Sequence, residues 1–72
     1  MTNGQIFLAR LSRLCRLRIE HADDFNNAGL QLLGRAIWAT VGDCTDYGCG
    51  PVAEAIVVAM QHELRASRKA ER

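Results

Sequence analysis

An apolar run in the middle of the chain most constrains what the chain can fold into. Residues 30–41 read LQLLGRAIWATV, the densest apolar stretch in the 72 residues. Its apolar positions recur at three- and four-residue intervals, the spacing of one stripe along an α-helix. The stripe consists of Leu30, Leu33, Ile37, Val41 and Cys44. We therefore expect a central helix whose stripe faces a core.

The same helix is apolar over more than half of its circumference. Leu32, Ala36 and Ala39 form a second strip beside the first, and Trp38 projects away from both. Such breadth in a short chain predicts cover on two sides, either from two helices of the same chain or from a partner subunit.

Two glycines, Gly29 and Gly34, lie within or near this helix. Each costs roughly 1 kcal/mol relative to alanine in a helix interior. Close approach of another helix, in the chain or across a dimer interface, would explain them, and a weakly optimised helix is the alternative.

Turn signals divide the rest of the chain into two further helices. Residues 2–20 are expected to form the first, with Thr2 or Asn3 as N-cap. The central helix is expected over about 24–43, capped by Asp23 or Asp24. The segment GDCTDYGCGP at 42–51 predicts a turn, with Pro51 opening a third helix over about 51–66 and a polar tail at 67–72.

The predicted fold is an all-α, three-helix domain spanning residues 1–72. Helices two and three are expected to form an antiparallel αα-hairpin, with helix one packed across them. A domain of 8.0 kDa buries only about 60% of the surface of its unfolded chain. Homo-oligomerisation is therefore expected to complete the core.

Charge and cysteine usage limit the classes of function. A net charge of +1 argues against a strongly basic nucleic-acid binder. The sequence has no run of about 18 apolar residues, the length that would predict a membrane span. Three cysteines at irregular spacing are not a secreted disulfide framework, so a cytoplasmic protein is expected. The sequence contains no arrangement of a nucleophile, a histidine and an acid that would predict an enzyme. No cofactor is expected.

The first predicted helix carries four arginines and no acidic residue before Glu20. These are Arg10, Arg13, Arg16 and Arg18. Such a basic face is a solvated surface, a docking site for an acidic protein surface or, less strongly indicated, a contact for nucleic-acid phosphates. No aromatic residues are interleaved with the arginines for base stacking.

The turn before the third helix holds two of the three thiols. Cys44 and Cys49 would supply two thiolates to a metal. His62 is the first candidate for a further ligand, with Cys15 and His21 as alternatives. A metal site is not the favoured interpretation, because Cys44 lies on the core stripe and free cysteine commonly packs as a small hydrophobe. Redox pairing of the two thiols is a further alternative.

The sequence favours a small, non-catalytic helical interaction or regulatory module that acts as a homo-oligomer. Trp38 and Val58 are the expected interface residues, because they extend the apolar surface of helices two and three beyond what one short chain can cover. The alternatives are a nucleic-acid-associated protein that uses the arginine face, and a metal- or thiol-bearing loop at Cys44 to Cys49.

Overall fold

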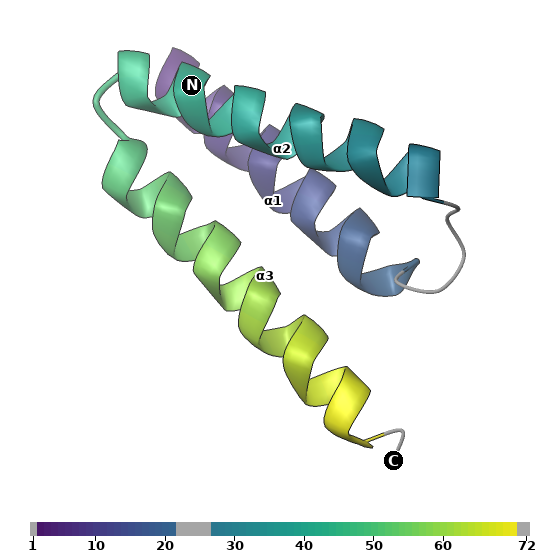
Figure 1. Ribbon diagram of the computed structural model, residues 1–72. Helices are drawn as coiled ribbons and strands as arrows, with labels where there is room; N and C mark the ends of the chain where they lie inside the picture. The colour runs from purple at the N-terminus through teal and green to yellow at the C-terminus, as the bar shows by residue number, and fades with distance from the viewer. Residues whose placement is uncertain (1, 22–26, 71–72) are drawn as a thin grey trace.

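The computed structural model describes residues 2–21 and 27–70, and these form three α-helices that pack against one another (Figure 1). They are α1 (Asn3–Glu20), α2 (Asn27–Asp46) and α3 (Gly50–Ala70). The prediction of an all-α, three-helix fold is confirmed. The molecule is elongated, with extents of 41 × 23 × 17 Å.

α1 begins at a capping box. Thr2 Oγ1 accepts a hydrogen bond from the Gln5 N–H at 3.2 Å, and Gln5 Oε1 accepts one from the Thr2 N–H at 2.9 Å. Two backbone donors that the first helical turn leaves unpaired are satisfied in this way. The predicted N-cap Thr2 is confirmed, and α1 ends at Glu20 as expected.

α2 ends later than predicted. The sequence predicted a helix end near residue 43, but α2 continues to Asp46 and stops in a Schellman motif. Gly48 adopts a φ of 81°, and its N–H donates to the Thr45 carbonyl at 3.0 Å. The Cys49 N–H donates to the Cys44 carbonyl at 2.9 Å. The turn between α2 and α3 is therefore residues 47–49, much shorter than the ten-residue segment that the composition indicated.

The bounds of α3 also differ from the prediction. α3 begins at Gly50, so Pro51 occupies the second helical position and not the first. A side chain at position 50 would have its Cβ 2.8 Å from Thr45 Oγ1, so the short turn requires glycine there. The helix extends to Ala70, beyond the predicted end at 66. The predicted caps Asp23 and Asp24 lie outside the described residues.

The helices diverge away from the short turn. α1 runs alongside α2, whereas the second half of α3 extends away from both (Figure 1). The antiparallel hairpin of the sequence analysis stays a prediction.

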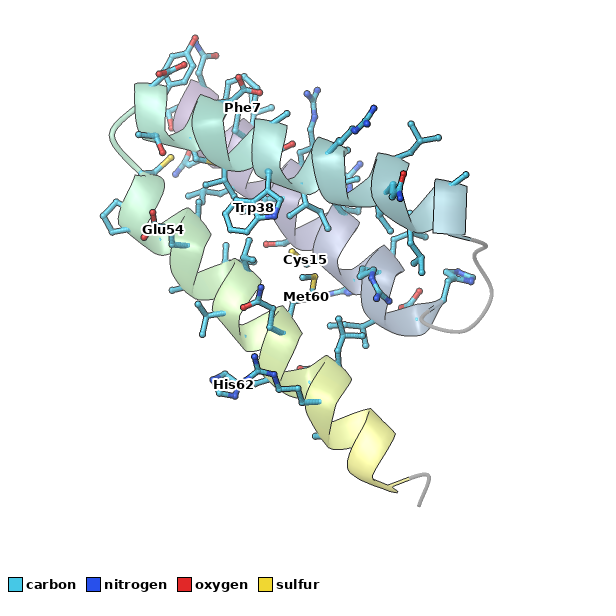
Figure 2. The ribbon with its side chains drawn as sticks, in the orientation of Figure 1. Phe7, Cys15, Trp38, Glu54, Met60 and His62 are labelled. Carbon is cyan, nitrogen blue, oxygen red and sulfur yellow. The ribbon has the colours of Figure 1, made fainter. Side chains whose placement is uncertain are left out.

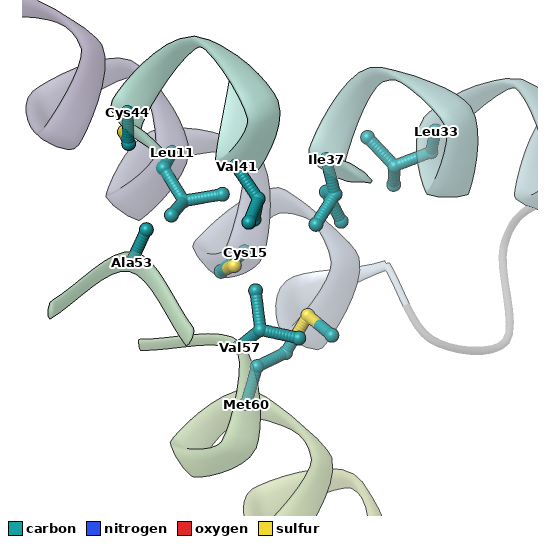
Figure 3. Packing of buried hydrophobic residues seen from close by; sticks show 9 residues of the cluster. All are labelled: Leu11, Cys15, Leu33, Ile37, Val41, Cys44, Ala53, Val57 and Met60. Carbon is teal, nitrogen blue, oxygen red and sulfur yellow. The ribbon is translucent and has the colours of Figure 1, made fainter. Parts of the chain in front are cut away.

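The core is aliphatic and sulfur-rich (Figure 3). Its nine buried residues are Leu11, Cys15, Leu33, Ile37, Val41, Cys44, Ala53, Val57 and Met60. Most of the predicted central stripe is therefore confirmed as the core face of α2. Thr40 is a buried polar residue on this helix, and its hydroxyl donates to the Ala36 carbonyl at 2.7 Å. That bond satisfies the buried hydroxyl.

Candidate functional site

The predicted interface residues Trp38 and Val58 are both largely exposed. Trp38 is 57% exposed and projects from α2 on the side of α3 (Figure 2). Val58 is 49% exposed. Exposed apolar side chains mark a surface that another molecule covers where they form a contiguous patch, so the relative placement of these two residues decides what their exposure means.

The placement of Val58 follows from the groove between α1 and α3. Ile56, Ala59 and Met60 line that groove, so their side of α3 faces α1. At about 100° per residue, Val58 lies roughly 160° from Ile56 and Met60 around the helix. Val58 therefore points away from α1. We group Gly34 and Trp38 on α2 with Val58 on α3 from their helical angles, and we call these three residues the α2–α3 face.

Gly34 lies one helical turn before Trp38 and has open space around it. A Cβ added at Gly34 would have no heavy atom within 4 Å beyond its own helix backbone. No other described helix of the chain therefore requires glycine here. Packing against the described residues therefore does not explain Gly34, which leaves two interpretations, a weakly optimised helix or the approach of another molecule.

Among the described residues, the most exposed large apolar side chain is one that the sequence did not single out. Leu32 is 65% exposed, although the helical pattern placed it in a small-residue strip beside the core. It lies roughly 120° around α2 from Trp38, so it does not belong to the α2–α3 face. The spacing identified the core stripe but not which of its two flanks is covered.

The four arginines of α1 do not form one face. Arg10 and Arg13 line a groove on the outer side of α1, and Arg16 lines the groove between α1 and α3. Arg18 is half-buried, and its Nη1 atom is buried without a hydrogen-bond partner in the part of the chain that the structure describes. These positions spread over roughly 200° of the helix circumference, so the arginines of the predicted basic face are divided between separate surfaces of α1.

An aromatic stack joins α1 to the turn between α2 and α3. The rings of Phe7 and Tyr47 lie 5.3 Å apart and are inclined by 28°. The Arg10 guanidinium carbon lies 5.7 Å from the centre of the Phe7 ring, a cation–π contact. Local sequence patterns do not reveal this stack, because its two rings are forty residues apart in the chain.

The predicted thiol pair is brought together at the turn. Cys44 is fully buried and Cys49 is half-buried, and the Cys49 thiol donates to the Cys44 carbonyl at 3.1 Å. Burial raises the pKa of the Cys44 thiol, and the neighbouring Cys49 and Asp43 raise it further. Burial likewise raises the pKa of Cys15.

The third member of the conditional metal set does not join the two thiols. His62 projects from α3 far from the turn (Figure 2). The thirteen residues from Cys49 correspond to roughly 20 Å of helix. Within residues 2–21 and 27–70, no three His, Cys, Asp or Glu side chains are grouped for metal binding. Cys44, Cys49 and His62 are therefore not assembled as a site.

The buried thiols predict a loss of stability in alkaline solution. The pKa of Cys15 and of Cys44 is raised in the folded chain above the ordinary value of 9.0, so the stabilisation is fully present below about pH 9. This stabilisation is lost as the pH rises through the raised pKa values that the two thiols have in the folded chain. Urea unfolding on both sides of pH 9 should show this fall. The double variant Cys15→Ala, Cys44→Ala should have a flatter pH dependence, and an unchanged slope would contradict the assignment.

No family model matches the chain, and no curated protein or solved structure is significantly similar to it. None of the three described helices combines the length and hydropathy that a bilayer crossing requires.

Proposed function

We propose that the protein is a small, non-catalytic helical interaction module that self-associates through the α2–α3 face. The observation that carries the proposal is Trp38, whose large ring is 57% exposed on a helix that otherwise supplies much of the core. Tryptophan is enriched among the residues that dominate binding energy at interfaces. Val58 on α3 extends the same apolar surface.

The size of the molecule supports an association. The described residues of this 72-residue chain bury nine apolar side chains, which make a small core, and small domains are stabilised by burying further surface against a partner.

A second copy of the chain is the partner that the α2–α3 face fits. In a two-fold dimer, if one residue of the first copy contacts a second residue of the other copy, then the second residue of the first copy also contacts the first residue of the other copy. Trp38 is a projecting ring, and Gly34, one turn away, has empty space above it. A two-fold arrangement packs each Trp38 ring over the Gly34 of the other copy. Trp38 supplies the projecting ring, and Gly34 leaves the space that receives the ring of the other copy.

Substitution of Trp38 tests the association. Trp38→Ser should weaken self-association by about 30-fold or more, because truncating an interface tryptophan typically removes about 2 kcal/mol of binding free energy. Sedimentation equilibrium over a micromolar concentration series measures the change. The matched control Leu32→Ser, on the other flank of α2, should leave the dissociation constant unchanged. A wild-type chain that stays monomeric throughout the series would overturn the proposal.

Gly34→Ala separates self-association from simple helix stability. In the single chain the added methyl group meets no neighbour, so it should stabilise the monomer by up to about 1 kcal/mol. In the proposed dimer it fills the space of the partner's Trp38 ring and should weaken association. Urea unfolding of dilute protein and sedimentation measure the two effects. A variant that is more stable and associates as tightly as wild type would exclude Gly34 from the interface.

A further inference from the structure

A second surface, on the outer side of α1, has a different chemistry from the α2–α3 face. It is a groove of about 560 Å³ lined by Ile6, Arg10, Arg13, Leu14 and Leu17. Ile6 is 43% and Leu17 is 38% exposed, while Leu14 packs partly against the core. Three apolar side chains therefore follow the groove, with two guanidinium groups between them.

The positive charge in this groove is not neutralised by its own helix. α1 carries no acidic residue before Glu20, and neither Arg10 nor Arg13 forms an ion pair within the described parts of the chain. The Arg10 guanidinium is held against the Phe7 ring, which itself stacks on Tyr47. A guanidinium held in this way loses less conformational freedom when it binds a carboxylate.

We propose that the outer groove of α1 binds an acidic amphipathic helix of another protein. Ile6 and Leu17 are eleven residues apart, or about 16 Å along the helix, which matches three turns of a partner helix. The partner places apolar side chains three and four residues apart against Ile6, Leu14 and Leu17. Carboxylates beside that stripe pair with Arg10 and Arg13, because the planar guanidinium accommodates both oxygens of a carboxylate.

The charge distribution favours this partner over a second copy of the same surface. A two-fold pairing of α1 grooves would place Arg10 and Arg13 against their counterparts, without carboxylates to separate them. Like charges in contact across an interface are strongly unfavourable. The α1 groove is therefore not the self-association surface, and it stays available when the α2–α3 face is covered.

The groove also differs from surfaces that bind nucleic acid or lipid. Arg16 and Arg18 lie elsewhere on α1. The described lining of the groove therefore holds two arginines, separated by apolar side chains that phosphates would not cover. Helices that lie on membranes segregate their basic residues on the face opposite the apolar one. In this groove arginines and apolar residues are mixed, as in the surface that an amphipathic acidic helix requires.

A synthetic acidic peptide tests the proposal. The probe is a fluorescein-labelled, helix-forming peptide with a leucine stripe flanked by glutamates, and the control peptide has glutamine at every glutamate. Fluorescence anisotropy with the full chain should show the acidic peptide binding at least about tenfold more tightly, and binding should weaken as salt is added. Equal binding of the two peptides, or binding of neither, would overturn the proposal.

Two variants of the chain locate the site. Arg13→Gln should weaken binding of the acidic peptide by about tenfold or more, since an exposed side chain is changed and the fold is kept. The matched control Arg16→Gln, in the other groove, should leave binding unchanged. Equal effects of the two substitutions, or tighter binding of anionic vesicles or a polynucleotide than of the peptide, would overturn it. Trp38→Ser should leave peptide binding unchanged, which separates this proposal from self-association.

Discussion

Leu11→Ala should lower the free energy of unfolding by about 2–5 kcal/mol. Leu11 is completely buried among core side chains from α2 and α3 (Figure 3). Removal of its isobutyl group leaves a cavity that the surrounding helices fill only in part. A chain of this length has a total stability of roughly 4–11 kcal/mol, so one substitution removes a large fraction of it.

Leu17→Ala is the matched control for this prediction. It is the same chemical change on the same helix, but Leu17 is 38% exposed and lies outside the buried cluster. Its loss should lower stability by less than about 1 kcal/mol. Urea unfolding followed by far-ultraviolet circular dichroism measures both variants. Equal losses would contradict the central position of Leu11.

The core could be predicted because it depends on spacing alone. Leu33, Ile37, Val41 and Cys44 recur at helical intervals, and all four are buried. The spacing fixes which side of α2 is apolar, and burial of that side follows wherever the other helices lie. The N-cap Thr2 was predictable for a similar reason, since capping is a local interaction over three residues.

The end of α2 could not be predicted from composition. Glycine at 42 and threonine at 45 both read as turn residues, yet both are helical. The Thr45 hydroxyl donates to the Val41 carbonyl at 3.0 Å, an interaction that keeps threonine within a helix. The helix stops where one residue adopts positive φ, and the sequence offers Gly42, Gly48 and Gly50 for that role without distinguishing them.

The candidate surfaces depend on how the helices are arranged, which the sequence does not specify. Trp38 and Val58 were predicted from an excess of apolar residues, whereas the exposure of Leu32 was missed. Periodicity gives the angle of each side chain around its own helix but not the position of the neighbouring helix. The position of the neighbouring helix is needed to see that Arg10 and Arg13 line one groove with Ile6. The same holds for Arg16, which lines another groove.

Gly48→Ala should lower the free energy of unfolding by about 1–2 kcal/mol, the cost of left-handed backbone for a residue with a Cβ. Gly48 has a φ of 81°, and an added Cβ would have no heavy atom within 4 Å. The loss therefore comes from the backbone and not from a steric clash. Because Gly48 and Cys49 donate the two hydrogen bonds that close α2, a change in this φ also disturbs the start of α3.

Two further variants distinguish backbone strain from other effects. Gly48→Asn should cost less than Gly48→Ala, because asparagine adopts left-handed backbone more readily. Gly42→Ala makes the same change at a helical glycine that also has no neighbour within 4 Å, and in dilute protein it should raise stability by up to about 1 kcal/mol. Urea unfolding should thus give opposite signs for alanine at 42 and at 48. The same sign at both positions would mean that Gly48 does not terminate α2 by its positive φ.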